Sequence, residues 1–334
     1  MNMTDWDTEH MTFAMKIVKE RFAMNSVAGH FAPYSWVDMM ARTVPSNRFD
    51  YSAQQRIVVD VENLTLYEPF AKCNFTLAQM NEFGSMTGEM LMGEMAGQNK
   101  VVTTITRAAS ALARWHDFLF FVGMEMNQTP DKLPKGVVPP GVDTGRPITN
   151  NVPVSLRQAA LQAEKDLNNQ LPMPIPVNGP LLNEGLVTAV YKAVLELESR
   201  GYYNTYHLVL GEALWEELHR PTSGSMVLPK DRIEPTLLGG HCHRTTTLPI
   251  DEALLASLDG PTFECVIAGS MDQHPRFDVL APVTLTETLY QYRVVDPFVP
   301  RIRENQAIVR LKINKPNEGE PNNEGGPNNE GGPN

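Results

Sequence analysis

Cysteine is scarce in this chain of 334 residues, which contains only Cys73, Cys242 and Cys265. Three widely spaced cysteines do not form the disulfide framework of a small secreted domain. The opening residues are acidic and lack the basic and then apolar order of a signal peptide. The longest strongly apolar stretch, 118–126, is far shorter than the roughly 20 residues that cross a bilayer. We therefore expect a soluble protein that is intracellular when made and has no membrane partner.

Positive charge is also in short supply. The chain has 28 lysines and arginines against 39 acidic side chains, which gives a formal net charge of −11. Proteins that bind nucleic acid by neutralising its phosphates normally carry the opposite balance, so a protein that reads DNA bases is not expected. The apolar fraction of 42% supplies a sizeable core and excludes disorder of the whole chain.

Catalytic motifs are missing as well. The chain has no glycine-rich dinucleotide motif, no phosphate-binding loop and no zinc-protease motif. The segment 84–88 resembles a nucleophile elbow only loosely, because its serine stands in the wrong place. The acidic pairs Glu216-Glu217 and Asp251-Glu252 fit solvated helix faces better than general acid–base roles. We therefore expect no catalytic residue and no cofactor.

The strongest candidate for a metal site is the tripeptide His241-Cys242-His243. Alternate residues of an extended chain point to the same side, so the two imidazoles could converge on one ion. No second cluster lies at a usable spacing, and surface histidines beside an idle thiol are the simpler interpretation. We expect no metal, and a monomeric hydrolase or metalloenzyme built around these two histidines remains a third hypothesis.

Hydrophobic periodicity predicts long helices early in the chain and strands late in it. Spacings of three and four predict helices over 8–25, 99–122 and 181–199, and a short helix over 211–219. Alternation and β-branched residues predict strands over 206–210, 263–268, 283–295 and 307–313. This order is typical of an α+β fold.

An arm is predicted between the first two long helices. Residues 31–56 read as irregular, 56–62 alternate as a strand, and 63–77 stay extended although they contain Pro69. A strand pair that carries Tyr67, Phe70 and Phe75 yet is interrupted by proline suggests a projecting arm.

Proline and a short repeat mark two further segments. Many of the 26 prolines lie in 129–153 and 171–180, and loops of that length usually reach for something or cover a surface. Residues 316–334 repeat the pattern PNNEGG and carry no apolar side chain, so we expect a disordered tail.

The segment 286–313, TETLYQYRVVDPFVPRIRENQAIVRLKI, resembles the ending of encapsulin shell proteins. In that family a Glu-Thr strand leads through a Val-Val-Asn/Asp-Pro turn into a final strand of the type Ala-Ile-x-x-Leu. The matching residues here are Glu287, Thr288, Val294, Val295, Asp296, Pro297, Ala307, Ile308 and Leu311. Residues 64–84, 111–124 and 206–210 resemble that family's extended loop, long helix and following strand. The order of these segments carries the resemblance more than any single motif does.

Encapsulins share the Hong Kong 97-type fold of tailed-bacteriophage major capsid proteins. The resemblance implies that fold, with an axial domain, a peripheral domain with a long spine helix, an extended β loop and an N-terminal arm. The expected divisions are 1–55 for the N-terminal helix and arm, and 56–97 for the extended loop and the start of the peripheral domain. Residues 98–313 then form the peripheral and axial domains with proline-rich insertions at 128–180, and 314–334 form the tail.

The resemblance and the missing motifs imply a structural, self-assembling shell protein and not an enzyme. The leading hypothesis is the major capsid protein of a tailed double-stranded DNA bacteriophage. Copies of the chain would form pentamers and hexamers of an icosahedral shell, in the virion, after assembly in the host cytoplasm. The shell would enclose DNA without sequence-specific binding, and portal, scaffold or decoration proteins are further candidate partners.

The alternative is an encapsulin nanocompartment that encloses a cargo enzyme. Residues 31–56 and the insertions at 128–180 depart from the encapsulin pattern, which favours the capsid hypothesis. In either shell, we expect Tyr67, Pro69, Phe70 and Phe75 of the extended loop at contacts between subunits rather than in the subunit's own core.

Overall fold

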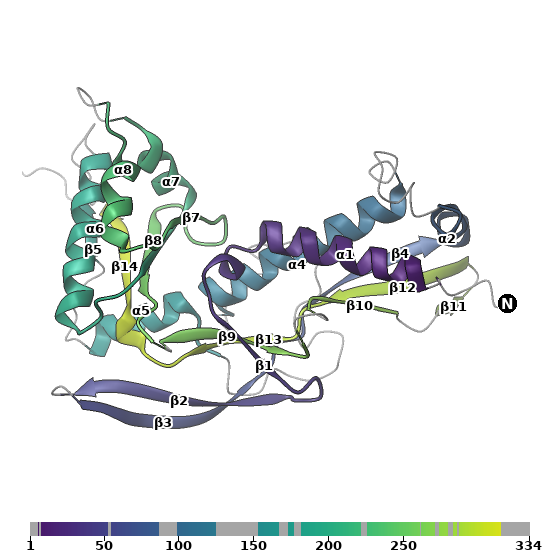
Figure 1. Ribbon diagram of the computed structural model, residues 1–334, viewed down its shortest axis with the longest axis horizontal. Helices are drawn as coiled ribbons and strands as arrows, with labels where there is room; N and C mark the ends of the chain where they lie inside the picture. Colours follow the sequence, from purple (N-terminus) through teal and green to yellow (C-terminus); the bar gives the residue numbers. More distant parts are fainter. Residues whose placement is uncertain are drawn as a thin grey trace, which may run out of the picture.

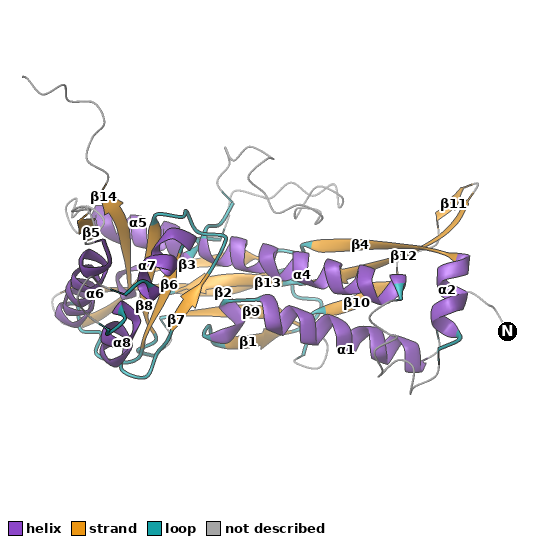
Figure 2. Ribbon diagram, turned by 90° about the horizontal axis from the view of Figure 1, so that it is seen from above, coloured by secondary structure: helices purple, strands orange, loops and turns teal. Residues whose placement is uncertain are grey.

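Buried hydrophobic side chains gather in two large clusters, and the molecule is elongated (Figures 1 and 2). The structure is a computed structural model. It describes residue 6 and residues 8–52, 55–86, 99–124, 153–166, 173–176, 182–221, 226–260, 262–270, 274–279, 283–285 and 287–314. The proline-rich segment 125–152 and the repeat tail lie outside the described residues.

Helices form both ends of the molecule. They are α1 (Thr8–Asn25), α2 (Leu77–Gly84), α4 (Lys100–Phe121), α5 (Leu156–Asp166), α6 (Leu182–Ser199), α7 (Glu212–His219) and α8 (Pro229–Ile233). Short 3-10 turns are η1 (Ala28–His30), η5 (Glu234–Leu237) and η7 (Asn305–Ala307). Among the described residues no helix is long and apolar enough to span a bilayer.

Within the described residues the strands form four sheets. They are β1 (Tyr34–Val37), β2 (Thr43–Ser52), β3 (Gln55–Thr65), β4 (Phe70–Thr76), β5 (Met173–Pro176), β6 (Tyr206–Leu210), β7 (Cys242–Arg244), β8 (Glu252–Ser257), β9 (Phe263–Ala268), β10 (Arg276–Val279), β11 (Val283–Leu285), β12 (Glu287–Val295), β13 (Phe298–Ile302) and β14 (Ile308–Asn314). The sheets are β1-β9-β13, β10-β12-β11 with β4 on β12, β5-β14-β8-β6-β7, and the ribbon β2-β3.

The long helix α4 is the centre of the larger cluster. Asn99 caps it by accepting a hydrogen bond from the backbone N–H of Val101 at 2.8 Å. Its apolar residues recur every three or four positions. They are buried because α1 packs on one side of α4 and the strands β4 and β12 pack on another. In Figure 1, α1 and α4 run side by side above β10 and β12.

A buried carboxylate ties the end of α1 to α4. Asp117 accepts hydrogen bonds from the Ser26 hydroxyl at 3.0 Å and from the backbone N–H groups of Val27 and Ala28 at 2.8 and 3.0 Å. Burial raises the pKa of Asp117 to about 6, although these donors pull it down. The contact satisfies backbone donors in the turn that follows α1.

The sheet β5-β14-β8-β6-β7 separates the two clusters. Along its strands, side chains alternate between an outward face covered by α6 and an inward face that points to α4. On β8, for example, Leu255 belongs to the outward cluster and Leu254 to the inward one. In Figure 1 this sheet and α6 form the left half of the molecule.

Most predicted elements are confirmed. The helices expected over 8–25, 99–122, 181–199 and 211–219 form within one residue of their predicted ends. The predicted strands form too, although 283–295 is divided into β11 and β12. The predicted α+β fold is confirmed.

The expectation that residues 31–56 are irregular is wrong. This segment contains β1 and β2, and β2 pairs with β3 from Thr43↔Thr65 to Ser52↔Gln55. The projecting arm is therefore 43–65, and the division expected at residues 55 and 56 falls next to its tip. Pro45 lies within β2, which is tolerated because a two-stranded ribbon has open edges.

Candidate functional site

The ribbon β2–β3 is the first candidate for a contact surface. At its base, Val44 and Leu64 are buried with Val266 of β9 and Val299 of β13. Beyond this base the two strands run on as a pair along the lower edge of the molecule (Figure 1). Both edges of a two-stranded ribbon present unpaired backbone groups, and isolated hairpins are marginally stable in water. The ribbon is therefore suited to contact another chain.

Arginines fasten the base of the ribbon. Arg301 donates to the carbonyl of Pro45 at 3.0 Å, and the backbone N–H of Phe49 donates to the carbonyl of Arg303 at 2.8 Å. Glu264 pairs with both arginines, at 2.8 and 2.7 Å. Burial alone would raise the pKa of Glu264, but Ser35 and the two guanidinium groups hold it below its ordinary value. These contacts set the direction in which the ribbon leaves the subunit.

The residues that we expected on the arm lie elsewhere. Tyr67, Phe70 and Phe75 are 2%, 6% and 1% exposed, and Pro69 is buried beside them. The expectation that they lie outside the subunit's own core is wrong, because residues 70–76 form β4 and pair with β12, from Phe70↔Val295 to Thr76↔Leu289. This pairing joins segments more than 200 residues apart, so local sequence does not reveal it.

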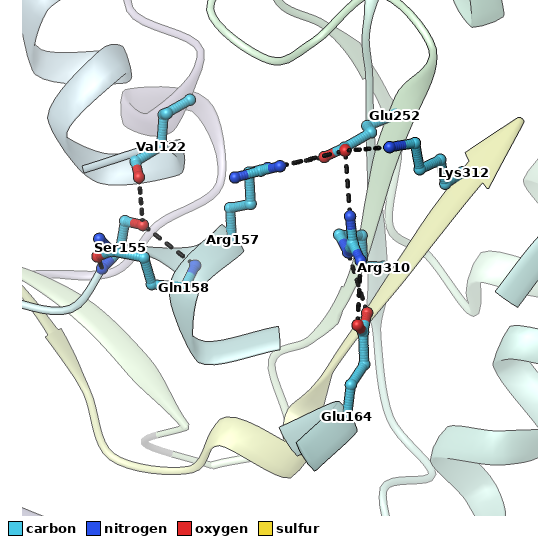
Figure 3. A network of polar contacts seen from close by, with 8 residues as sticks. All are labelled: Val122, Ser155, Arg157, Gln158, Glu164, Glu252, Arg310 and Lys312. Atoms are coloured by element: carbon cyan, nitrogen blue, oxygen red, sulfur yellow. Dashed lines mark hydrogen bonds and ion pairs between the residues drawn. The ribbon is translucent and has the colours of Figure 1, made fainter. Parts of the chain in front are cut away.

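A network of charged side chains that was not predicted from the sequence lies on the inward face of the sheet that carries β8 and β14 (Figure 3). Glu252 of β8 is 1% exposed and accepts hydrogen bonds from Arg157 of α5 at 2.7 Å and from Arg310 of β14 at 3.1 Å. Arg310 also donates twice to Glu164 of α5, at 3.0 Å each, and Lys312 lies 3.6 Å from Glu252. The network fastens α5 to the sheet by charge.

Glu252 was expected on a solvated helix face, and this expectation is wrong. The antiparallel register of β8 and β14 pairs Glu252 with Lys312 and Leu254 with Arg310, so the charges share one face. Burial alone would raise the pKa of Glu252, but the three neighbouring cations hold it below its ordinary value. A hint was present in 308–313, where Arg310 and Lys312 occupy one side of an otherwise apolar alternation.

The helix α5 is also tied to the end of α4 (Figure 3). The Ser155 hydroxyl donates to the carbonyl of Val122 at 2.8 Å and accepts from the backbone N–H of Gln158 at 3.2 Å. The Gln158 side chain accepts from the backbone N–H of Ser155 at 3.0 Å, which completes a capping box. Gly123 has φ +78°, and a Cβ there would lie 2.9 Å from that of Ser155, so the turn requires glycine.

The predicted histidine pair is divided by the fold. His243 of β7 meets His207 of β6, with Nε2 and Nδ1 3.0 Å apart, whereas His241 is exposed. Burial, together with the neighbouring imidazoles, lowers the pKa of both His207 and His243 to about 4. Phe31 stacks on His207 at 5.1 Å between ring centroids. No group of three potential metal ligands converges within the part of the chain that the structure describes.

A third polar cluster is enclosed completely. His116 Nδ1 lies 2.7 Å from Asp296 Oδ2, and its Nε2 lies 3.7 Å from the Cys265 sulfur. All three side chains are buried, so this Asp-His-Cys arrangement has no surface from which a substrate could reach the thiol. The Asp296 carboxylate raises the pKa of His116 although burial opposes it, so an internal ion pair is its role.

Comparisons with known proteins agree on the fold. Residues 170–273 match the family described as encapsulating protein for peroxidase. A virus-like particle from Pyrococcus furiosus has a similar structure, with a TM-score of 0.61 and 12% identity, over 91% of this chain and 100% of the other. A structure from Mycobacterium phage Bobi has a TM-score of 0.51 and 14% identity, over 87% and 91% of the two chains. No curated protein sequence matches.

The structural likenesses extend over most of this chain, whereas the family match is confined to residues 170–273. The family match covers the sheet β5-β14-β8-β6-β7 except β14, with α6 to α8 and β9. The matched family is described as encapsulating a peroxidase, and the Pyrococcus furiosus structure is that of a virus-like particle. The chain has the Hong Kong 97-type fold of capsid and encapsulin subunits, and it is encapsulin-like in sequence over 170–273.

Proposed function

We propose that the protein is the self-assembling subunit of a closed icosahedral shell, and that the ribbon β2–β3 is a contact between neighbouring subunits. The observation that carries this proposal is the ribbon itself, which packs on β9 and β13 through Val44 and Leu64, is held by Arg301 and Arg303 at Pro45 and Phe49, and continues beyond Phe49 as a two-stranded pair. A contact that repeats around every symmetry axis gives each ribbon a partner. The fold shared with shell-forming proteins supports it.

The first candidate for the contents is the double-stranded DNA of a tailed bacteriophage. The formal net charge of −11 suits a container that holds DNA without adhering to it. The likeness to the phage Bobi structure supports this candidate. Pentamers and hexamers of the chain would then form the head in the host cytoplasm, with portal, scaffold or decoration proteins as partners.

The second candidate is a compartment that encloses a cargo enzyme. Its support is the match of residues 170–273 to a family described as encapsulating a peroxidase. The two candidates share the shell and differ only in what the shell holds.

Electron microscopy of particles purified from the native host tests both candidates. Spherical or head-shaped particles with nuclease-protected DNA are expected for a phage head, and DNA-free particles filled with protein for a compartment. A monodisperse monomer of 37.2 kDa would contradict both.

A shortened ribbon tests the contact. Replacing 47–61 by an Asn-Gly turn joins the paired residues Ser46 and Glu62 and keeps the buried base with Val44 and Leu64. We expect a folded subunit that no longer assembles, measured by circular dichroism and by sedimentation. Closed particles from this variant would show that the ribbon is not an essential contact.

A further inference from the structure

The inward face of the sheet carries titratable side chains at both of its ends, and its middle is apolar. At the end near β14 lie Glu252, Arg310 and Lys312, which meet Arg157 and Glu164 of α5. In the middle are apolar side chains, namely Val209, Leu254, Ala256 and Ile308. We call this face, with the side chains of α5 and Phe31 packed on it, the joint.

At the other end of the joint lies the imidazole pair. Val209 of β6 pairs with His243 of β7, so His207, Val209 and His243 share the inward face. Phe31 lies between this pair and the end of α4, with ring centroids 5.2 Å from His243 and 6.0 Å from Phe121. The other titratable groups that act on the pair are imidazoles as well, His241 before β7 and His30 of η1.

Acid weakens the contacts at both ends of the joint. Two imidazoles 3.0 Å apart share one hydrogen bond when neutral and repel each other when both are charged. Protonation of Glu252 would remove the buried anion that Arg157, Arg310 and Lys312 share, so their mutual repulsion would be opposed only by Glu164, which pairs with Arg310.

We propose that the joint is an acid-sensitive device, in which protonation of the imidazole pair and then of Glu252 separates α5 and Phe31 from the sheet while α6 stays bound to the other face. The sheet and α6 would then move as one body relative to α4. This inference concerns contacts within one chain and does not depend on shell formation.

The order of the two steps follows from the direction of each pKa. In the folded chain the pKa of each paired histidine is lowered from 6.5 to about 4, so the closed joint binds fewer protons than the open one and weakens as pH falls below 6.5. The pKa of Glu252 is lowered from 4.5, so its contribution is present above 4.5 and is lost only below it. The imidazole pair therefore responds first.

The population of the open state should rise steeply with acid. An open state in which one histidine regains its ordinary pKa is favoured roughly 60-fold more at pH 4.5 than at pH 7. Hydrogen exchange reports such local opening segment by segment. After correction for the intrinsic exchange rate, we expect protection of 206–210 to fall at least about tenfold between pH 7 and pH 4.5 and protection of 156–166 to fall only below pH 4.5, while protection of 186–197 in α6 changes less than about threefold.

The decisive variant is His207→Gln with His243→Gln in the full chain. Glutamine cannot become charged and still offers a donor and an acceptor. We expect this variant to keep its protection of 206–210 at pH 4.5. His219→Gln is the matched control, because His219 is exposed on α7 and bonds only locally to Trp215. It should open like the wild type. Equal opening of the double variant and the wild type would overturn the proposal, as would opening of α6 before α5.

Glu252→Gln tests the other end of the joint. We expect exchange of 156–166 to increase at pH 7 already, since its cations lose their anion. If this variant does not fold, Glu164→Gln removes only the partly exposed partner of Arg310 and should move the opening of α5 to a higher pH. Unchanged exchange of α5 in a folded variant would contradict the proposal. Size-exclusion chromatography at each pH checks that the assembly state is the same in the samples compared.

Discussion

The two faces of one sheet are held by different forces. On the outward face, the side chains that meet α6 are apolar and fully buried, among them Leu208, Leu255 and Leu311. The alternate residues of the same strands point to the inward face, and they include the buried polar side chains Glu252, Arg310 and His207. The same β8 and β14 thus carry hydrophobic packing on one side and an ion network on the other.

One sheet can therefore hold a helix firmly on one face and make contacts that depend on pH on the other. Apolar burial is non-directional and does not depend on protonation. A buried ion pair holds one geometry, and it becomes strongly unfavourable when one partner is lost. We expect the α6 side to behave as part of a constant body, and the joint to change with pH and with single charges.

Removal of one charge from the joint should have the largest effect. Glu252→Gln removes the 1%-exposed anion that Arg157, Arg310 and Lys312 share, although Arg310 keeps Glu164, and should lower the free energy of unfolding by about 3–5 kcal/mol. Urea denaturation of the subunit measures it. The matched control is Glu212→Gln, because Glu212 forms an ion pair with Arg244 in which both side chains are about half exposed. This control should cost less than about 1 kcal/mol. Equal losses in both variants would remove the contrast between buried and exposed pairs.

A cavity on the opposite face should cost slightly less and should not respond to pH. Leu255 is 0% exposed, so Leu255→Ala should lower the free energy of unfolding by about 3 kcal/mol. The same loss is expected at pH 7 and at pH 5, because this substitution removes only apolar contacts and no titratable group. A loss that grows with acid would show that the two faces are not independent.

The pH dependence of stability should shift with the imidazole pair. Because the pKa of His207 and His243 is lowered to about 4, wild-type stability should fall as pH drops below 6.5. The His207→Gln, His243→Gln variant should lose about 2 kcal/mol less than the wild type between pH 7 and pH 4.5. Only this difference reports the pair, because Asp117 and His274 titrate in both proteins. Parallel pH profiles would contradict the expectation.

The smallest effect is expected on the outer side of α6. Leu195 is 63% exposed, so Leu195→Asp should change the free energy of unfolding by less than about 0.5 kcal/mol. Thermal unfolding of the subunit measures this. A large loss would mean that another chain covers this side of α6 in the sample.

Much of the fold could be predicted from local sequence. The helices 8–25 and 99–122 follow from apolar residues at spacings of three and four, and 263–268 reads as a strand from its β-branched and aromatic residues. The resemblance in 286–313 indicated the fold, although Tyr67, Phe70 and Phe75 were placed on the wrong element. They belong to the core because β4 joins β12, which is a long-range pairing.

The joint could not be predicted in the same way. Glu252 and Arg310 are 58 residues apart and meet through strand register, while His207 and His243 meet through a parallel pairing across 36 residues. A solvated helix face and a surface histidine were reasonable interpretations of each segment alone. The role of Glu252 follows from the cations around it, and strand register brings these together only in the folded chain.

Local sequence was enough to predict where most helices and strands form and which side of each is apolar. Which faces meet, that the arm is 43–65, and that charges close the inward face of one sheet became known from the folded structure. The cause of this difference is distance along the chain. Periodicity is a property of neighbouring residues, whereas burial, strand register and charge pairing depend on segments that folding brings together.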